Sequence, residues 1–190
     1  MIGLLGGSFD PIHHAHLLVA QAAVEALGLD ELRFVPAREQ PFKQGQHGAT
    51  AADRARMVAL AIEGEPRFRL EPLELERPGP SYTVDTLRAL RSREPGAVFA
   101  LLIGADAAAE LELWREASSL PSLARIVAFA RAGAPAPGTA LVAETITVPS
   151  LDISATAIRG RVAAGRSIRY WVPECVADYV AVHGLYRNGE

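Results

Sequence analysis

The sequence predicts an α/β fold in which a parallel, doubly wound sheet carries a small C-terminal helical appendage. Short apolar runs alternate with amphipathic helical patterns through residues 1–150, and such alternation is typical of parallel sheets built from β/α repeats. The run 98–103 is apolar at both even and odd positions, as expected for an interior strand with both faces covered. Only helical patterns follow in 151–190. We therefore expect one domain over 1–190, with an α/β core and a helical part.

Each predicted strand is a short run of apolar or β-branched residues bounded by turn residues or helical patterns. In chain order, the predicted strands cover 2–5, 33–36, 68–70, 98–103, 125–130 and 145–148. Each predicted helix shows apolar residues at intervals of three and four positions. The predicted helices cover 16–27, 52–62, 82–91, 106–114, 119–123, 155–164 and 173–183. Two stretches rich in Gly, Pro, Ala or polar residues, 42–50 and 132–140, are expected to be surface loops.

The overall composition is that of a soluble globular enzyme, with 49% hydrophobic and 22% charged residues. A net charge of −3 and a pI near 6.0 argue against general nucleic-acid binding. The single cysteine, Cys175, excludes an internal disulfide framework, and Met1 leads into a strand without the basic region of a signal peptide. No apolar run reaches transmembrane length. We expect a cytoplasmic enzyme that binds neither nucleic acid nor membrane, and the composition leaves a homo-oligomer open.

The most informative motif, GGSFDPIHHAH at residues 6–16, joins the first predicted strand to the first helix. Gly6 and Gly7 allow a tight turn and a close approach of the backbone to a ligand. The following helix N-terminus offers unpaired N–H groups and positive dipole potential, which favour phosphate. His13 and His16 are three residues apart, so they share one helix face and can act together on one ligand. The motif predicts a site for the phosphates of a nucleotide.

Two other interpretations of this motif compete with the phosphate site. Zinc is bound by histidines at such spacing, but a nearby Cys/His cluster is absent and Cys175 is remote in sequence. A simpler alternative is a helix capped by Asp10, with Pro11 as its first residue and two solvated histidines. That alternative does not explain why glycines and histidines follow the end of a strand, where ligands bind in open α/β sheets. We favour the phosphate site.

A second candidate for phosphate binding lies at residues 153–159. Ser154 is placed to cap a helix, Thr156 follows two residues later, and Arg159 lies within the next turn. Two hydroxyl groups, free helix N–H groups and a forked cation suit a triphosphate tail. A capped helix without any ligand explains the serine equally well.

Other residues with candidate roles lie between these two motifs. Lys43 is the only lysine of the chain, and its compact charge on a flexible stem suits a moving phosphoryl group. The segment around Ser81 and Thr83 predicts a loop that leads into a helix, with either residue as its cap. Asp106 follows the central strand and is placed either to bind a ligand or to cap a helix. Trp114, at helical spacing, is either a core residue or a platform for stacking.

Two of these motifs resemble signatures of the HxGH nucleotidyltransferase superfamily, and most closely those of bacterial nicotinate mononucleotide adenylyltransferases. Residues 6–16 are similar to the family segment GGxFDPxHxGH, with Ala15 in place of its last glycine. Residues 153–159 resemble the segment ISSTxIR, with Ala155 in place of the second serine.

The resemblance extends to further segments in the same order. Residues 81–87 resemble SYTxxTL, and residues 41–43 resemble PHK with Phe42 at the histidine position. The similarity runs from Gly6 to Tyr186 and implies a Rossmann-like fold. It also implies a nucleotidyltransferase that binds ATP and nicotinate mononucleotide.

The resemblance implies functional roles residue by residue. The implied catalytic residues are His13, His16, Lys43 and Arg159. The implied ATP-binding residues are Gly6, Gly7, Ser8, Phe9, His13, His16, Gly104, Asp106, Arg131, Ser154, Thr156 and Arg159. The implied nicotinate mononucleotide-binding residues are Ser8, Lys43, Ser81, Tyr82, Thr83, Thr86 and Trp114. No protein ligand for a metal is implied.

Some of these roles are specific. The resemblance implies that Asp106 binds the ribose of adenosine and that Arg131 lies near the adenine. It implies that backbone amides of the segment 81–87 bind the nicotinate carboxylate and that Trp114 stacks on the pyridine ring. The C-terminal aromatic residues, among them Tyr186, are spaced for packing and are expected to be structural.

The implied reaction joins ATP and nicotinate mononucleotide to give nicotinate adenine dinucleotide and pyrophosphate, a late step of NAD synthesis. The attacking phosphomonoester has a second pKa of about 6, so no general base is needed. Catalysis then depends on positioning and charge stabilisation, and we expect Mg²⁺ to be carried by oxygens of ATP. One alternative is a sister enzyme that accepts nicotinamide mononucleotide or both acceptors. A second alternative is a nucleotide-binding sensor without turnover.

Overall fold

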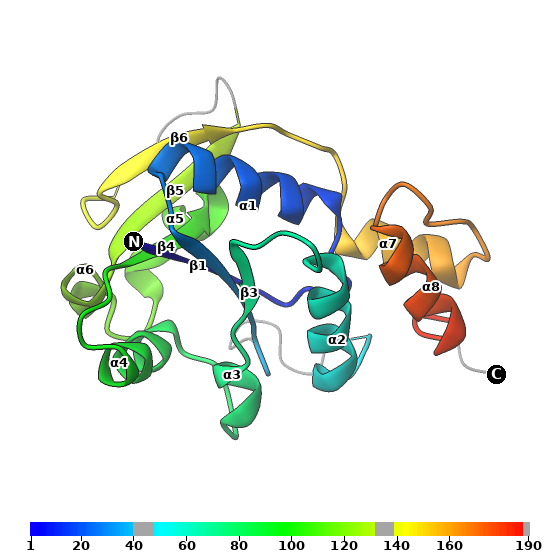
Figure 1. The fold of residues 1–190 in the computed structure, drawn as a ribbon, viewed down its shortest axis with the longest axis horizontal. Coiled ribbons are helices and arrows are strands. Elements are labelled where there is room, and N and C mark those ends of the chain that lie inside the picture. Colours follow the sequence, from blue (N-terminus) through cyan, green and yellow to red (C-terminus); the bar gives the residue numbers. More distant parts are fainter. Residues whose placement is uncertain (40–47, 132–138, 188–190) are drawn as a thin grey trace.

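The computed structural model describes residues 1–39, 48–131 and 139–187. Its sheet has six parallel strands in the order β3-β2-β1-β4-β5-β6 (Figure 1). The strands are β1 (Ile2–Gly7), β2 (Glu31–Pro36), β3 (Phe68–Leu70), β4 (Phe99–Gly104), β5 (Arg125–Arg131) and β6 (Glu144–Val148). The chain steps outwards from β1 to one edge and then from β4 to the other edge. The predicted doubly wound parallel sheet is therefore confirmed, and each predicted strand is present.

Helices cover both faces of the sheet (Figure 1). In chain order the helices are α1 (His14–Leu27), α2 (Ala51–Ala61), α3 (Leu73–Glu76), α4 (Thr83–Arg93), α5 (Ala105–Ala109), α6 (Leu120–Leu123), α7 (Ala155–Ala163) and α8 (Glu174–Val182), of which α7 and α8 lie beside α2 rather than on the sheet. One cluster of buried apolar side chains lies under α1 and α2, and a second lies under α3, α4, α5 and α6. Among the residues that the structure describes, no helix is both long and apolar enough to cross a membrane.

Strand β4 is one of the two central strands, with β1, and its side chains are buried on both faces of the sheet. Leu102 packs in the cluster under α1, whereas Leu101 and Ile103 pack in the cluster on the opposite face. This alternation confirms that the run of apolar residues at both parities is an interior strand.

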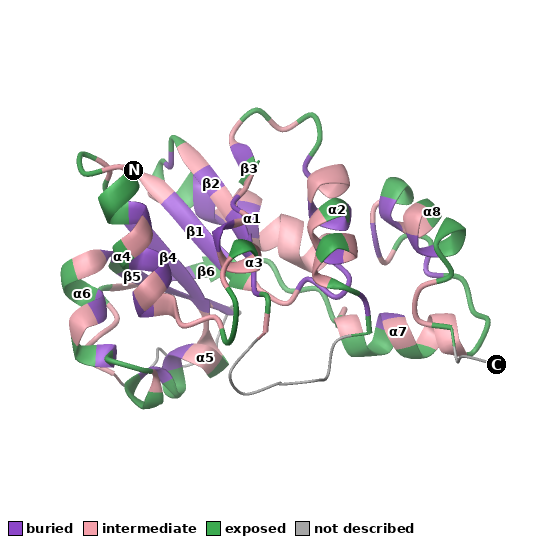
Figure 2. Ribbon diagram, turned by 90° about the horizontal axis from the view of Figure 1, so that it is seen from below, coloured by how far each residue is buried: buried purple, intermediate pink, exposed green. Residues whose placement is uncertain are grey.

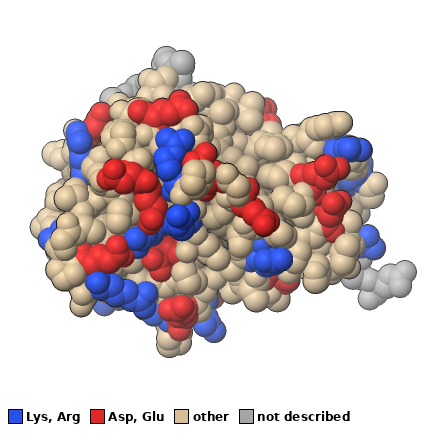
Figure 3. Space-filling view, in the orientation of Figure 1, with Lys and Arg blue, Asp and Glu red and all other residues tan. Residues whose placement is uncertain are grey.

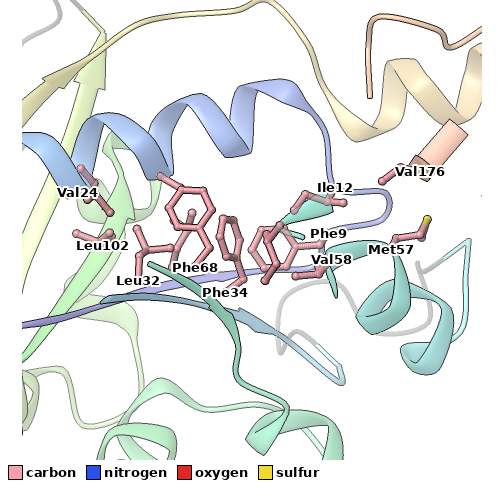
Figure 4. Close-up of a cluster of buried hydrophobic side chains, with 14 of the residues drawn as sticks. Phe9, Ile12, Val24, Leu32, Phe34, Met57, Val58, Phe68, Leu102 and Val176 are labelled. Carbon is pink, nitrogen blue, oxygen red and sulfur yellow. The ribbon is translucent and has the colours of Figure 1, made fainter. Parts of the chain in front are cut away.

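A column of aromatic rings links the loop after β1 to the core (Figure 4). Phe34 makes edge-to-face contacts with Phe9 at 5.7 Å and with Phe68 at 5.3 Å between ring centroids. Phe9 has a φ of 48°, a left-handed conformation that is uncommon for a bulky residue. A Cβ atom on Gly7 would lie only 3.0 Å from the Phe9 ring. Gly7 is therefore required for the packing of Phe9, and this packing anchors the loop.

The C-terminal helices pack beside α2 (Figure 1). Ile158 of α7 and Val176 of α8 belong to the same buried cluster as Val58 of α2. Figure 2 shows that both C-terminal helices carry buried as well as exposed positions. The carbonyl oxygen of Trp171 also accepts a hydrogen bond from the first backbone N–H of α1, on His14, at 3.2 Å. The helical part thus joins the core at the start of α1.

One predicted helix differs from the structure, and one short helix was not predicted. The single helix predicted over 106–114 is wrong: α5 ends at Ala109, a short 3-10 helix covers Leu111–Leu113, and Trp114 is extended. The apolar spacing arises because Leu111 is fully buried in a tighter turn. Helix α3, which spans only about one turn, was not predicted.

We expect the core and the helical part to unfold in one transition, because they share one apolar cluster. Trp114→Phe and Trp171→Phe variants each retain one tryptophan, in the helical part and in the core respectively. In urea, adding Val176→Ala to either variant should lower its free energy of unfolding by roughly 1–3 kcal/mol. If the substitution shifts only the transition reported by Trp171, the helical part is a separate domain.

Candidate active site

The segments that follow β1 and β4, which carry the predicted residues Gly7 and Gly104, meet where the strand order reverses. Strands β1 and β4 are neighbours, and their carboxyl ends lie at Gly7 and Gly104. Ligands of open α/β sheets bind at such a switch point. Gly6 is exposed there, and an added Cβ would meet no atom within 4 Å. The space beside Gly6 is therefore open to a ligand.

The structure brings His13 and His16 together at the start of α1. Their rings stack with centroids 3.7 Å apart and an interplanar angle of 21°. The backbone N–H of His13 donates to Nδ1 of His16 at 3.2 Å, and the ring of Phe9 lies edge-on to His16 at 5.1 Å. Because Nδ1 of His16 accepts a hydrogen bond, the neutral imidazole carries its proton on Nε2. His16 is thereby prepared as a hydrogen-bond donor.

Burial keeps both imidazoles neutral. It lowers the pKa of His13 from 6.5 to about 4, and the neighbouring His14 contributes a smaller lowering. Burial also lowers the pKa of His16 well below its ordinary value, with a further contribution from His13. Near pH 7, in the protein without ligand, the pair therefore offers N–H donors rather than full positive charges.

Asp10 is buried and connects four parts of the chain. Its Oδ2 accepts from the backbone N–H of Gly48 at 2.8 Å, and its Oδ1 accepts from the N–H of Ala49 at 3.1 Å. The hydroxyl of Tyr186 donates to Oδ1 at 2.8 Å. Nη1 of Arg159 donates to the backbone carbonyl of Asp10 at 2.8 Å and lies 3.9 Å from its Oδ2. Asp10 thus holds the motif loop, residues 8–13 between β1 and α1, to the segment before α2, to α7 and to the C-terminal segment.

The alternative in which Asp10 caps the first helix, with Pro11 as its first residue, is wrong. The N-cap is His13, and α1 begins at His14. Local sequence suits a cap at Asp10, but its carboxylate is committed to tertiary partners instead. The residues between them form a turn that buries Ile12.

Arg54 was not predicted as a site residue, yet its buried guanidinium links the two predicted ligand segments. Nη1 donates to the carbonyl of Ser8 at 2.6 Å, and Nη2 donates to the carbonyl of Arg38 at 3.0 Å. The N–H of Arg38 in turn donates to Oγ of Ser81 at 3.1 Å. The sequence did contain a signal: Arg54 lies three residues before Met57, which places a charged side chain on the apolar, buried face of α2.

Helix α7 brings the second motif to the first. Ser154 caps α7, as predicted, and its Oγ accepts from the N–H of Ala157 at 3.2 Å. Nη2 of Arg159 is 3.4 Å from Oγ1 of Thr156, while Nη1 of the same guanidinium contacts Asp10. The predicted cation and both hydroxyl groups therefore lie in one region next to the motif loop.

The predicted acceptor segment forms the start of α4. The prediction that Ser81 or Thr83 caps this helix is wrong, because Tyr82 is the N-cap and makes no capping contact through its side chain. The N–H of Ser81 donates to the carbonyl of Glu39 at 2.9 Å. The hydroxyl of Thr86 donates to Glu74 at 2.7 Å and so is already paired within the protein. The ligand roles of these residues stay predictions.

Trp114 lies beside the same helix. The neighbouring Arg115 lies over the ring of Tyr82 at 4.7 Å and forms an ion pair with Asp85 at 3.5 Å. Trp114 itself is half-buried and packs against the cluster under α4. It therefore contributes to the core, and its stacking on a pyridine ring stays a prediction.

The remaining predicted residues lie at the ends of strands or outside the described part. Gly104 ends β4 and is the N-cap of α5, so the alternative in which Asp106 caps this helix is wrong. Asp106 is exposed in the first turn, which leaves its carboxylate accessible. Arg131 ends β5 opposite Val148, and its side chain is not described. Lys43 lies outside the described residues.

Surface charge, pockets and possible metal ligands give no second candidate site among the described residues. On the face in Figure 3, Lys and Arg side chains are interleaved with Asp and Glu. A pocket of about 520 Å³ lies between α7 and α8, and its lining includes none of the predicted site residues. Within 1–39, 48–131 and 139–187, no three His, Cys, Asp or Glu side chains are grouped so that they could hold a metal ion.

Comparisons with known sequences match nearly the whole chain. A model of the Cytidylyltransferase-like family matches residues 4–161. A Thermus thermophilus protein named "Probable nicotinate-nucleotide adenylyltransferase" is 48% identical over 186 residues, which are 98% of this chain and 99% of that protein. A Gemmatimonas aurantiaca protein of the same name is 46% identical, over 98% of this chain and 92% of that protein.

A solved structure agrees in fold. Nicotinic acid mononucleotide adenylyltransferase of Plasmodium falciparum, complexed with NaAD, superposes with a TM-score of 0.80 at 21% identity. The superposition covers 97% of this chain and 96% of that chain. At this identity the likeness supports the fold alone, whereas the sequence matches determine the family. The chain belongs to the nicotinate-nucleotide adenylyltransferase family of cytidylyltransferase-like proteins.

Proposed function

We propose that the protein transfers the adenylyl group of ATP to nicotinate mononucleotide in NAD synthesis. The acceptor phosphate oxygen forms a bond to the α-phosphorus, and the bond from that phosphorus to the bridging oxygen breaks. Pyrophosphate leaves with the electron pair, and nicotinate adenine dinucleotide remains. The observation that carries the proposal is the stacked pair of His13 and His16 at the sheet switch point, in a chain that is 48% identical to a relative of this name.

The protein contributes positioning and charge stabilisation in this reaction. His16 donates from Nε2 to an oxygen between the α- and β-phosphates as charge develops there, and His13 keeps its ring in place by stacking. Arg159, Ser154 and Thr156 hold the departing pyrophosphate. Lys43 is the proposed cation that brings the two anionic substrates together.

The acceptor side is proposed to lie between the start of α4 and Trp114. Backbone N–H donors of the Ser81 segment suit a carboxylate, whereas an amide needs an acceptor as well. The pyridine ring is proposed to stack on Trp114. Nicotinamide mononucleotide as an equal acceptor is the alternative that the first experiment below distinguishes.

We propose that Mg²⁺ enters with ATP. Phosphate oxygens and water supply most of its preferred octahedral ligands, and its charge offsets that of the triphosphate. The motif carboxylate, Asp10, accepts from backbone amides and Tyr186, so it is committed to the protein scaffold. The expected cytoplasmic location and the open homo-oligomer stay predictions.

The first experiment measures pyrophosphate release with ATP and Mg²⁺ and compares nicotinate mononucleotide with nicotinamide mononucleotide. We expect release with the acid at a kcat/KM at least about tenfold higher, since backbone donors favour the carboxylate. Equal rates would make the enzyme dual-specific. ATP binding without release with either acceptor would instead support the sensor alternative.

His16→Ala should lower kcat/KM by roughly 100- to 1000-fold, the usual effect of removing one donor to developing charge. His14→Ala is the matched control, because it removes a neighbouring imidazole while the hydrogen bond to the C-terminal part, made by the backbone N–H of His14, is kept. The control should retain most of the activity. If turnover of His16→Ala stays within about threefold of the wild type, the role given to His16 is wrong.

The buried His13 should make the protein less stable in acid. Its pKa is about 4 when folded and 6.5 ordinarily, so between these values the unfolded state binds more protons. The stabilisation that the neutral His13 provides is complete above about pH 6.5 and is lost as the pH falls. At about pH 5 the free energy of unfolding should have fallen by about 2 kcal/mol for this reason. In urea titrations between about pH 7.5 and pH 5, His13→Asn should lose correspondingly less of its free energy of unfolding than the wild type. Equal losses in His13→Asn and wild type would contradict the assignment.

A further inference from the structure

We propose that Tyr186 is a positioning residue of the nucleotide site, acting through Asp10 on Arg159. The inference rests on the proposed function for the identity of the ligand, a nucleoside triphosphate. Tyr186 lies beyond α8, and the sequence pattern predicted only a packing role for it.

The contact between Tyr186 and Asp10 is short, partly buried and distant in sequence. The phenol O–H donates to Oδ1 of Asp10 at 2.8 Å across a separation of 176 residues. Asp10 is only 2% exposed, so its carboxylate depends on these protein donors rather than on water. Burial raises the pKa of Tyr186, which keeps the phenol protonated as a donor.

The backbone at Tyr186 is specialised for this contact. Its φ is 63°, in the left-handed region that a bulky side chain rarely adopts. Such a conformation persists only where surrounding contacts hold it, and it is common at functional sites. Phe9, next to Asp10 on the other side of the contact, is also left-handed with a φ of 48°.

The ring of Tyr186 also confines Arg159. A Cβ on Gly48 would lie 2.8 Å from Cδ1 of Tyr186 and 3.1 Å from Cδ of Arg159. The ring and the arginine stem therefore share the narrow space next to the Cα of Gly48. Asp10 contacts the polar ends of both side chains, the phenol and the guanidinium.

This arrangement fixes the guanidinium before the ligand arrives. Nη1 is held on the carbonyl of Asp10, while Nη2 lies next to Thr156. A guanidinium has five N–H donors, so others remain to bind phosphate oxygens. Preorganisation reduces the ordering cost of binding, and it is lost if the carboxylate turns away after losing its phenol partner.

The test compares Tyr186→Phe with Tyr179→Phe. Tyr179 lies on α8, and its hydroxyl donates to Asp53 at 3.0 Å, so the control removes an equivalent phenol–carboxylate bond outside the motif. Tyr186→Phe should raise the Kd and the KM for ATP roughly tenfold while the KM for nicotinate mononucleotide changes less than about twofold. Tyr179→Phe should leave all three near wild type. Equal effects of the two variants would overturn the inference.

A double-mutant cycle with Arg159→Ala separates positioning from a general loss of structure. If Tyr186 acts through Arg159, Tyr186→Phe should weaken ATP binding little further in the Arg159→Ala background. If Tyr186→Phe raises the Kd for ATP by the same factor with and without Arg159→Ala, the inference is overturned. Thermal unfolding checks that each variant is folded. Gly48→Ala keeps the phenol but crowds both the ring of Tyr186 and the stem of Arg159, so it should also weaken ATP binding.

ATP binding is measured directly, so the outcome does not depend on turnover. If the wild type binds ATP but transfers nothing to nicotinate mononucleotide, the proposed function fails, and the ATP affinities still decide the role of Tyr186. If transfer is normal and Tyr186→Phe binds ATP as the wild type does, only the inference about Tyr186 fails.

Discussion

The carboxylate of Asp10 lies where the loop after β1, the segment before α2, helix α7 and the chain beyond α8 meet. A buried charge is costly unless it is hydrogen-bonded and paired. Two backbone amides, one phenol and one guanidinium meet that requirement. Because these donors come from separate segments, each segment is held in place by the same group. The turn that follows Asp10 leads directly to the stacked histidines, so their position depends on the same contact.

The charges around this carboxylate explain how the site attracts a polyanion without charged histidines. Arg159 contacts Asp10 directly, and the buried Arg54 also interacts with its charge. Two guanidinium groups thus lie near one carboxylate, while His13 and His16 remain neutral N–H donors. Fixed donors in a partly buried site stabilise developing charge well, because they need little rearrangement during the reaction. The contacts of Asp10 therefore both hold the loop in place and bring the positive charges to the site.

Local sequence patterns determined what could be predicted. Apolar alternation revealed the six strands, and the glycines and histidines of residues 6–16 marked the switch point, because all of these signals lie within short windows. The function of Asp10 could not be found in this way. Its partners Gly48 and Tyr186 are 38 and 176 residues away, and its neighbours suit a helix cap equally well. Arg54 left a weaker signal, a charge on the buried face of α2, whose meaning depended on the carbonyl groups that it contacts.

The wide separation of Asp10 and Tyr186 has a consequence for how the protein is made. The loop that begins at Gly6 leaves the ribosome early, but its buried carboxylate gains its contact with the phenol only when Tyr186 has emerged. The backbone amides of Gly48 and Ala49 emerge much earlier, so the nascent chain can make these contacts to Asp10 while the phenol contact is still missing. The proposed role of Tyr186 therefore places the completion of the nucleotide site late in synthesis, after the six strands of the sheet have emerged.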